Sequence, residues 1–499
     1  MPIPVIDLFA GPGGLNEGFN QVRDAKGNRI FQTRVSVEFE ELAHRTLELR
    51  ALFRRLEDHG ENAHYYEYVR GKITRDSLFS ATGEHGKLAS REALHATLGK
   101  SNSDNAAIEA HIAAELAGAP KDGFVLIGGP PCQAYSLVGR ARRTRETRAK
   151  FESDHKHVLY LEYLRIVSRF RPAAFLMENV PGLLSASLSG TATFDLIRHD
   201  LGGAGYELHP LNPQDAAGEP ADDPRVFIIR ADEHGVPQAR SRVFILGLRK
   251  DLGLKARTLS PAPGEATTVA DVIGDLPRIR SRLSKEQDSG AAWLAAIRHV
   301  ATYDLSVLGV KFSRSIRDRL AAMHPNYPLG TATMPPTDRH PAKLADWYSD
   351  PDLGCVLNHG SRGHMRRDLM RYFFWAQYGR IFGRSPTLSE VPHYLRPEHV
   401  NISGDATDVP FADRFRVQLS TKPSTTITSH IAKDGHYYIH PDPKQCRSLT
   451  VRAAARLQTF PDNYLFEGAA TDQFRQVGNA VPPFLARQIG RLVADILGA

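Results

Sequence analysis

Short apolar runs recur along the chain, and helical patterns separate most of them. Runs of about four to eight apolar residues are typical of buried strands, whereas apolar positions three and four residues apart indicate helices. The pattern predicts strands at 4–9, 33–39, 124–127, 173–177, 206–211 and 243–248, and helices that start near Leu15 or span 40–56, 154–170 and 194–201. Strands that alternate with helices predict an open α/β sheet with helices on both faces.

One predicted strand leads directly into a cysteine. The run 124–127 is followed without a spacer by Gly-Gly-Pro-Pro-Cys-Gln-Ala-Tyr-Ser at 128–136. Two glycines allow a sharp turn and two prolines stiffen the exit, which places Cys132 at the carboxyl end of a buried strand, where open α/β sheets keep their chemistry. Most free cysteines are core hydrophobes. A cysteine that only packs in the core needs no Gly-Gly-Pro-Pro segment before it, so we interpret Cys132 as a candidate nucleophile.

The first predicted strand also ends in glycines. Gly11, Gly13 and Gly14 form a turn into a helix. Such a turn is typical of sites where backbone amides approach a polar ligand closely. Glu38 ends the second strand, where an acid can bind the two hydroxyls of a ribose, and Phe39 beside it can lie against a base. A solvated helix start explains Glu38 equally well.

Three further stretches carry candidate chemistry. Residues 139–150 contain six basic side chains and one acid; a solvated loop is the alternative, but the position beside Cys132 favours a phosphate clamp. Glu178 follows the strand 173–177 and is a candidate general acid. Gln238, Arg240 and Arg242 alternate in an extended segment and would project from one face, although a surface salt-bridge stripe fits them as well.

Residues 57–118 interrupt the alternation of strands and helices. They are polar, contain glycines and include weakly helical stretches at 90–98 and 106–116. We interpret them as an insertion with two or three helices and assign them no chemistry.

Composition narrows the class of protein. The 499 residues are 41% apolar and 24% charged, which is ordinary for a globular protein and long enough for two or three domains. Three cysteines without a Cys-x-x-Cys pair build neither a disulfide framework nor a zinc cluster, so no metal is expected. No basic leader or long apolar run is present, which predicts a cytoplasmic protein with no membrane contact. The net charge of +7 favours a polyanionic partner.

Together these stretches resemble the cytosine-5 DNA methyltransferases, of the prokaryotic restriction-modification type. The resemblance rests on motifs that follow the order of the family over nearly the whole chain. They are 7–14 (DLFAGPGG), Glu38, 129–133 (GPPCQ), 178–180 (ENV), 238–242 (QARSR), 447–452 (RSLTVR), 456–461 (RLQTFP) and 476–483 (QVGNAVPP).

The resemblance implies transfer of a methyl group from S-adenosylmethionine to carbon 5 of a cytosine flipped out of duplex DNA. Cys132 would add to carbon 6, because carbon 5 is a poor nucleophile until a thiolate converts the ring to an enamine. Glu178 would hydrogen-bond or protonate ring N3. Asn179, Arg240 and Arg242 would hold the sulfur, the pyrimidine oxygen and the loop, with Arg242 nearest the thiolate. The base that removes the carbon 5 proton is left open, with water as a candidate.

The resemblance also implies the binding residues. The cofactor residues would be Asp7, Phe9, Gly11, Gly13, Gly14, Glu38, Phe39, Pro130, Asn479 and Val481, and the DNA contacts would be Gln133, Ser136, Arg140, Arg142, Arg143 and Gln238. The expected fold is a Rossmann-like S-adenosylmethionine-dependent sheet with a smaller mixed target-recognition domain. The catalytic domain would cover 1–255, with the insertion at 57–118, the target-recognition domain 256–471, and residues 472–499 would return to the catalytic domain.

The chain departs from the family pattern at two positions. Lys72, in Gly71-Lys72-Ile73, stands where the family commonly has an acid on the adenine amino group, so this partner is open: either the contact is lost or the insertion shifts the register. Ala453 stands where the family has Glu after Leu-Thr-x-Arg. Thr450 can still cap the following helix, but half of the capping box is missing, at a cost of about 0.5–1 kcal/mol.

We expect a monomer that acts on duplex DNA, with a restriction endonuclease for the same site as a possible functional partner. The sequence does not tell a restriction-linked enzyme from an orphan or viral one, and it does not identify the bases read. Two rival functions remain: the same chemistry on tRNA, and a DNA-binding relative without turnover.

Overall fold

The computed structural model describes residues 2–120, 123–130, 155–188, 191–213, 223–305, 308–397 and 414–499. The chain forms two compact units. Unit 1 comprises Met1–Tyr65, Ile73–Gly264 and Ala480–Ala499, and unit 2 comprises Tyr66–Lys72 and Glu265–Asn479. Each unit has its own hydrophobic core and is described by itself.

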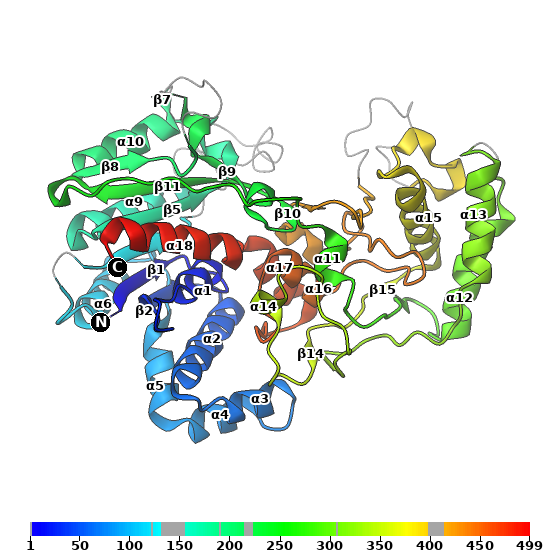
Figure 1. Cartoon of the computed structure of the whole chain (residues 1–499), viewed down its shortest axis with the longest axis horizontal. Helices are drawn as coiled ribbons and strands as arrows, with labels where there is room; N and C mark the ends of the chain where they lie inside the picture. The colour runs from blue at the N-terminus through cyan, green and yellow to red at the C-terminus, as the bar shows by residue number, and fades with distance from the viewer. Residues whose placement is uncertain are drawn as a thin grey trace. The chain divides into compact units, whose positions relative to one another are not determined.

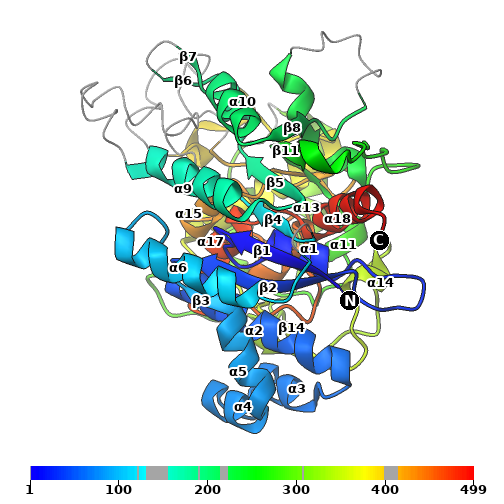
Figure 2. The same cartoon turned by 90° about the vertical axis from the view of Figure 1, so that its left-hand side faces the viewer.

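Unit 1 is built on a mixed sheet of eight strands in the described part of the chain. Strand β11 pairs antiparallel with β5 and with the edge strand β8 (Figure 1), and five strands run parallel in the order β3-β2-β1-β4-β5 (Figure 2). The strands are β1 (Ile3–Leu8), β2 (Phe31–Glu38), β3 (Ala93–His95), β4 (Val125–Gly128), β5 (Ala174–Asn179), β8 (Tyr206–His209), β9 (Ile228–Arg230) and β11 (Ser241–Arg249). The parallel order brings the carboxyl ends of β1, β2, β4 and β5 to one edge of the sheet.

Alternate residues of each strand pack on opposite faces of this sheet. Val5 belongs to one core cluster with helices α1 (Gly14–Asn20) and α18 (Pro483–Leu497). Ile6 belongs to a second cluster with α6 (Asn102–Glu115), α9 (His155–Phe170) and α10 (Thr193–Gly203). Figure 2 shows helices on both sides of the strands. The expected doubly covered α/β sheet is confirmed, because apolar side chains on both faces of each central strand need helical cover.

The sequence located most elements of the sheet to within a few residues, but it missed β3. The helix expected at 90–98 is wrong: α5 (Gly83–Glu92) ends at Glu92, and 93–95 form a strand parallel to β2. The stretch 57–118 is therefore more than a helical insertion, since it also supplies an edge strand of the sheet. Its other helices are the end of α2 (Glu41–His59), α3 (Ala63–Val69), α4 (Arg75–Ala81) and α6.

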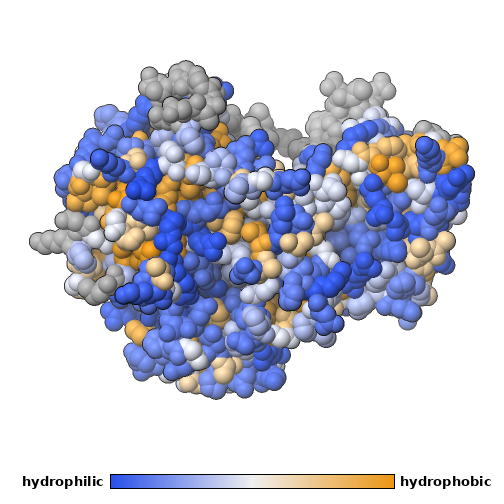
Figure 3. All heavy atoms as spheres, viewed as in Figure 1, coloured by the Kyte–Doolittle hydropathy of each residue, from blue (hydrophilic) through white to orange (hydrophobic). Residues whose placement is uncertain are grey.

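Unit 2 has a largely helical core. Helix α15 (Arg366–Phe382) is buried over most of its length and packs with α12 (Gly290–Arg298) and α13 (Val310–Ala321) around Trp293, Phe312 and Trp375. Short strand pairs, β12 (Arg282–Leu283) with β15 (Gly363–His364) and β13 (Thr333–Met334) with β14 (Val356–Leu357), join its loops. Apolar residues gather on the surface over α13 and α15 (Figure 3), where Val310, Ile381 and Phe382 are exposed.

The chain re-enters unit 1 later than the expected residue 472. Helix α17 (Ala470–Asn479) packs against α16 (Val451–Leu457) and the 3-10 turn η11 (Ser429–Ala432), all within unit 2. A Cβ on Gly478 would lie 2.3 Å from the carbonyl carbon of Thr428, so a glycine is required for this close packing. At the other end of unit 2, the boundary lies at Gly264 rather than at 255.

A buried ion pair joins α1 to α2. Arg50 Nε donates to Glu17 Oε2 at 2.9 Å and Arg50 Nη2 to Oε1 at 2.7 Å, with both side chains buried. Burial alone would raise the pKa of Glu17, but the charge and hydrogen bonds of Arg50, aided by Arg54, outweigh it and lower the pKa to about 2. The bidentate pair fixes the helix that follows the glycine turn.

We predict that Glu17→Gln lowers the free energy of unfolding of the protein by about 3–5 kcal/mol, because it leaves the Arg50 guanidinium buried without a counter-charge. Urea unfolding at neutral pH measures the change. The pair contributes fully above the unfolded pKa near 4.5 and is lost as the pH falls towards 2, so the difference between wild type and variant should shrink over that range. Asp58→Asn, which breaks the partly exposed pair with Arg29, is the control and should cost less than about 1 kcal/mol. Equal effects of the two variants would contradict the assignment.

Candidate active site

Strand β4 ends in a narrow passage, where a side chain is excluded at Gly128 and tightly restricted at Gly129. A Cβ on Gly128 would lie 2.5 Å from the carbonyl oxygen of Leu8 in β1, and a Cβ on Gly129 would lie 3.0 Å from Glu178 Oε2. The backbone that leads to Cys132 thus passes directly against β1 on one side and the Glu178 carboxylate on the other. Cys132 itself lies outside the described residues, as do Gln133, Ser136, Arg140, Arg142 and Arg143.

Glu178 and Arg242 form an ion pair at this end of the sheet. Glu178 lies near the end of β5, and the antiparallel strand β11 pairs Phe244 with Glu178 and Val243 with Asn179. Arg242 Nε lies 2.9 Å from Glu178 Oε1, and both side chains are about one-sixth exposed. The guanidinium fixes the carboxylate beside Gly129 while both groups stay accessible to a ligand.

Asn179 holds the backbone just before Cys132. Its Nδ2 donates to the carbonyl oxygen of Pro130 at 3.2 Å, and its Oδ1 accepts from the amide of Val180 at 2.9 Å. Asn179 and Pro130 are both buried. Adjacent residues of β5 therefore perform two tasks: Glu178 faces the passage, and Asn179 fixes the chain that enters the cysteine segment.

The expected common face of Gln238, Arg240 and Arg242 is wrong. Gln238 and Arg240 are fully buried, whereas Arg242 is partly exposed on the next strand. The reason is a tight turn: the amide of Arg240 donates to the carbonyl oxygen of Gln238 at 2.9 Å, and the alternation of an extended strand stops there. The surface salt-bridge alternative fails as well, because two of the three side chains lie inside unit 1.

The glycine turn after β1 is strained and closely packed. Phe9, Gly11 and Gly13 have positive φ angles of 58°, 56° and 91°. A Cβ on Gly14 would lie 2.2 Å from the carbonyl oxygen of Val481, which arrives from the far end of the chain. No atom of a described residue lies within 4 Å of a Cβ built on Gly11, so the described part of the chain leaves the space above this part of the turn open. The turn thus combines a packed side, against Val481, with an open one.

Glu38 shapes the glycine turn from the neighbouring strand. Its Oε2 accepts from the amide of Gly11 at 2.7 Å, and its Oε1 accepts from the amide of Glu40 at 2.8 Å. Burial raises the pKa of the Glu38 carboxyl, and the hydrogen bonds from backbone amides offset only part of the increase. A solvated helix start is excluded, because Glu38 is buried and Glu40 caps α2. The ring of Phe39, by contrast, is 61% exposed beside it.

Two other expected cofactor residues have distinct environments. Asp7 is buried in β1, and neither carboxylate oxygen receives a hydrogen bond within normal distance from a described residue. Burial raises the pKa of the Asp7 carboxyl well above its usual range. Asn479 is exposed at the end of α17 in unit 2.

The structure shows where the chain runs at Lys72, the position at which the departure from the family pattern left the partner of the adenine amino group open. Lys72 is exposed just after α3, and its amide closes that helix on the carbonyl oxygen of Glu67. The strand beside β2 ends instead at His95, and the amide of Ala96 donates to the carbonyl oxygen of Glu38 at 3.1 Å. The sequence missed this strand, because a three-residue strand gives no apolar run to detect, and the partner of the adenine amino group stays open.

Residues 102–494, most of the chain, match the model of the family described as C-5 cytosine-specific DNA methylase. The chain belongs to this family. It is a DNA cytosine-5 methyltransferase, and the glycine passage, the Glu178–Arg242 pair and the Asn179 contact are its candidate catalytic centre.

Relatives and a solved structure agree with this assignment. The type II methyltransferase M.Bpa9945I of Bacillus paralicheniformis is 31% identical, and the alignment covers 99% of each chain. M.AgeI of Thalassovita gelatinovora is 30% identical over 76% of this chain and 84% of its own. The crystal structure of a DNA modification methyltransferase encoded within an E. coli prophage aligns over 100% of both chains with a TM-score of 0.54 at 19% identity, which supports the fold.

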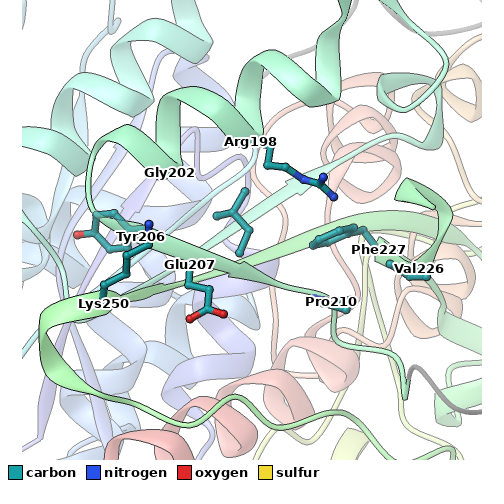
Figure 4. Close-up of a pocket in the computed structure, with 9 residues that line it drawn as sticks. Arg198, Gly202, Tyr206, Glu207, Pro210, Val226, Phe227 and Lys250 are labelled. Atoms are coloured by element: carbon teal, nitrogen blue, oxygen red, sulfur yellow. The ribbon is translucent and has the colours of Figure 1, made fainter. Parts of the chain in front are cut away.

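A pocket of about 320 Å³ lies elsewhere in unit 1, along the edge strand β8 (Figure 4). Its lining residues are Arg198, Gly202, Tyr206, Glu207, Leu208, Pro210, Val226, Phe227 and Lys250. None of the candidate site residues contributes to it. In the described residues, no helix is long and apolar enough to cross a membrane, and no group of three potential ligands for a metal ion is found.

We predict that Gly129→Ala lowers the rate of cytosine methylation by at least about tenfold, because the new Cβ displaces the Glu178 carboxylate from the passage. A steady-state methylation assay on DNA measures the rate. Gly202→Ala is the control: it lies in α10, no atom of the described residues lies within 4 Å of a Cβ built there, and the substitution should leave the rate unchanged. A Gly129→Ala enzyme as active as wild type would show that the close contact with Glu178 is not needed.

Proposed function

We propose that the enzyme transfers the methyl group of S-adenosylmethionine to carbon 5 of a flipped cytosine in a specific duplex DNA sequence, with Cys132 as the nucleophile. The observation that carries this proposal is the ion-paired Glu178 beside Gly129, together with the Asn179 contact that fixes Pro130. These groups lie at the entrance of the segment that contains Cys132, where the reacting base must sit.

The residues divide the chemistry among them. The Cys132 thiolate adds to carbon 6, and the electron pair of the C5–C6 double bond moves to carbon 5. Carbon 5 would then take the methyl group, and the sulfonium sulfur would leave with the electron pair of the broken sulfur–methyl bond as a neutral thioether. Glu178 hydrogen-bonds or protonates ring N3 and so draws charge from carbon 6 during the addition. After methylation, a base removes the proton of carbon 5, the double bond re-forms and the thiolate leaves; water is the candidate base.

Arg242 and Asn179 support these steps. Arg242 fixes Glu178 and is the positive charge that we assign to the thiolate, whose ordinary pKa near 8.5 leaves only a small ionised fraction at pH 7. Asn179 sets the course of the chain into Cys132. We assign buried Arg240, which closes the tight turn just before Arg242, a positioning role.

The cofactor site follows from the glycine turn. S-adenosylmethionine, when bound, supplies the methyl group on a positively charged sulfur. The open space above Gly11 and the exposed ring of Phe39 beside buried Glu38 fit a nucleoside: Phe39 would stack on adenine and Glu38 would accept from the ribose hydroxyls. Phe9, Gly13, Gly14 and Val481 would form the wall of the site, Asp7 its floor, and Pro130 and Asn479 its remaining contacts.

Unit 2 is our candidate for target recognition, because it occupies the part of the chain where the family keeps that region and carries many basic side chains. Gln133, Ser136, Arg140, Arg142 and Arg143 remain proposed DNA contacts, whereas the buried side chain of Gln238 does not fit that role. We place the enzyme in the cytoplasm as a monomer. Several relatives are named type II methyltransferases, which supports a restriction endonuclease of the same specificity as its functional partner.

We predict that labelled methyl groups pass from S-adenosylmethionine to mixed-sequence duplex DNA and that Cys132→Ala abolishes the transfer. A parallel incubation with tRNA tests the RNA-acting alternative. Sequencing of the product for 5-methylcytosine then gives the recognition site. DNA that contains 5-fluorocytosine should trap the wild-type enzyme covalently, because the fluorine cannot leave as a proton does. Label in tRNA alone would contradict DNA as the substrate, and label in DNA with Cys132→Ala would contradict the nucleophile.

A second prediction concerns Glu38. Glu38→Gln should weaken S-adenosylmethionine binding by about 10- to 100-fold, because an amide nitrogen cannot accept hydrogen bonds from the Gly11 amide or from ribose. Isothermal titration calorimetry with the free protein measures the dissociation constant. Glu41→Gln, an exposed residue in the first turn of α2, is the matched control and should bind like wild type. Equal affinity of both variants would contradict the role of Glu38.

A further inference from the structure

Arg362 has an unusual environment in unit 2. It immediately precedes β15, and its guanidinium carbon lies 3.8 Å from the centre of the Phe474 ring, on helix α17. The side chain is half-buried. Within the described residues, however, no hydrogen bond or ion pair reaches the guanidinium. A stacked guanidinium therefore keeps its donors available.

Other arginines of unit 2 that are buried have hydrogen-bond acceptors or acidic partners for their guanidinium groups. Arg452 donates to the carbonyl oxygens of Leu357, Pro461 and Tyr464, at 2.7–3.0 Å. Arg456 pairs with Asp275 at 2.6 Å and with Asp462 at 2.8 Å. The guanidinium of Arg362 is only half-buried and has no acceptor among the described residues, so its donors are left for water or for an external partner.

The stack holds the guanidinium in place before any partner binds. Phe474 is buried, so the ring cannot move without disturbing α17. On the other side, Gly435 lies close: a Cβ there would be 3.6 Å from Arg362 Nη1 and 2.8 Å from the Cβ of Ser448. Burial lowers the pKa of Arg362 to about 10, which leaves the group charged at neutral pH. The charge is thus fixed in position, and a partner need not order a flexible side chain.

The surroundings favour an anion as that partner. Lys433 lies two residues before Gly435, is exposed and makes no ion pair in the part of the chain that the structure describes. Asp434, the nearby acid, pairs with Arg414 at 3.6 Å. A planar guanidinium stacked on a ring presents its donor edge, and this fork matches the two oxygens of a phosphate.

We propose that Arg362, stacked on Phe474, binds a phosphate of the DNA backbone and so positions unit 2 on the duplex. This inference rests on the proposed function and names one contact through which the enzyme would bind its DNA substrate. The O6 and N7 atoms of guanine offer the same acceptor geometry in the major groove. A phosphate contact strengthens binding to DNA of any sequence, whereas a guanine contact strengthens binding only to DNA that has guanine at that position. Affinities for two duplexes of different sequence therefore distinguish a phosphate contact from a guanine contact.

The test compares Arg362→Ala, Arg362→Lys and Arg366→Ala in the full-length protein. Arg366 is the control, because it is an exposed arginine four residues away that is already paired with Glu286. Fluorescence anisotropy measures affinity for a duplex that carries the sequence methylated by wild type and for an unrelated duplex, at several salt concentrations. Thermal unfolding and S-adenosylmethionine binding are measured on the same samples.

We expect Arg362→Ala to bind both duplexes about tenfold more weakly and to lower the slope of log affinity against log salt by about one. Arg362→Lys should keep most of the salt slope but not the full affinity, since it keeps the charge and loses the fork. Arg366→Ala and S-adenosylmethionine binding should match wild type.

Three outcomes would overturn the proposal. Loss confined to the methylated sequence would assign Arg362 to a guanine edge. Unchanged DNA binding with a lowered unfolding temperature would assign the stack to stability alone. Unchanged binding and stability would leave Arg362 without either role. Methyl transfer by wild type is scored separately, so the failure of this contact is distinguishable from the failure of the proposed function.

Discussion

The candidate active site depends on the close passage of Gly128 and Gly129 between β1 and Glu178. A strand that ends with two side chains at these positions would collide with the Leu8 carbonyl and with the carboxylate. The missing side chains let the backbone pass Glu178 at Gly129 and leave Asn179 within reach of Pro130. The positions of the proposed general acid, Glu178, and of the Asn179 amide relative to the end of β4 therefore depend on one steric constraint.

The same kind of constraint joins the two ends of the chain. Gly14 lies against the Val481 carbonyl, and a Cβ on Gly18 would lie 2.3 Å from the Cβ of Ala486. Helix α18 can cover one face of the sheet only because α1 offers no side chains at these crossings. The last residues of the chain thus pack against the glycine turn that follows the first strand. Because both ends of the chain belong to unit 1, unit 2 is inserted between two parts of unit 1.

The sequence predicted the strands that are buried on both faces, and it failed for short segments whose conformation depends on a single strand pairing or turn. The runs that became β1, β4, β5 and β11 are apolar on both faces, so their pattern is unambiguous. Strand β3 has three residues and is held by its pairing to β2, a contact that no local pattern encodes. The alternation of Gln238 and Arg240 with Arg242 looked extended, but a turn closed by one backbone hydrogen bond buried the first two. Residues 131–154, which contain Cys132, lie outside the described residues, so the position of the thiol is still a prediction.

Helix α16 begins with an incomplete capping box, because Ala453 stands where the family has Glu, and a tertiary contact replaces the missing half. Thr450 Oγ1 accepts from the amide of Ala453 at 3.1 Å, so one half of the cap is present without a glutamate. The ring of His359 then bridges the cap to a neighbouring loop: Nδ1 lies 2.9 Å from Thr450 Oγ1, and Nε2 lies 2.9 Å from the carbonyl oxygen of Pro277. Burial lowers the pKa of His359 to about 3, so the ring is neutral, and Nε2 donates to the carbonyl while Nδ1 accepts from the hydroxyl. A neutral histidine thus orients the threonine hydroxyl, and the helix start gains a tertiary anchor where a capping box would have been purely local.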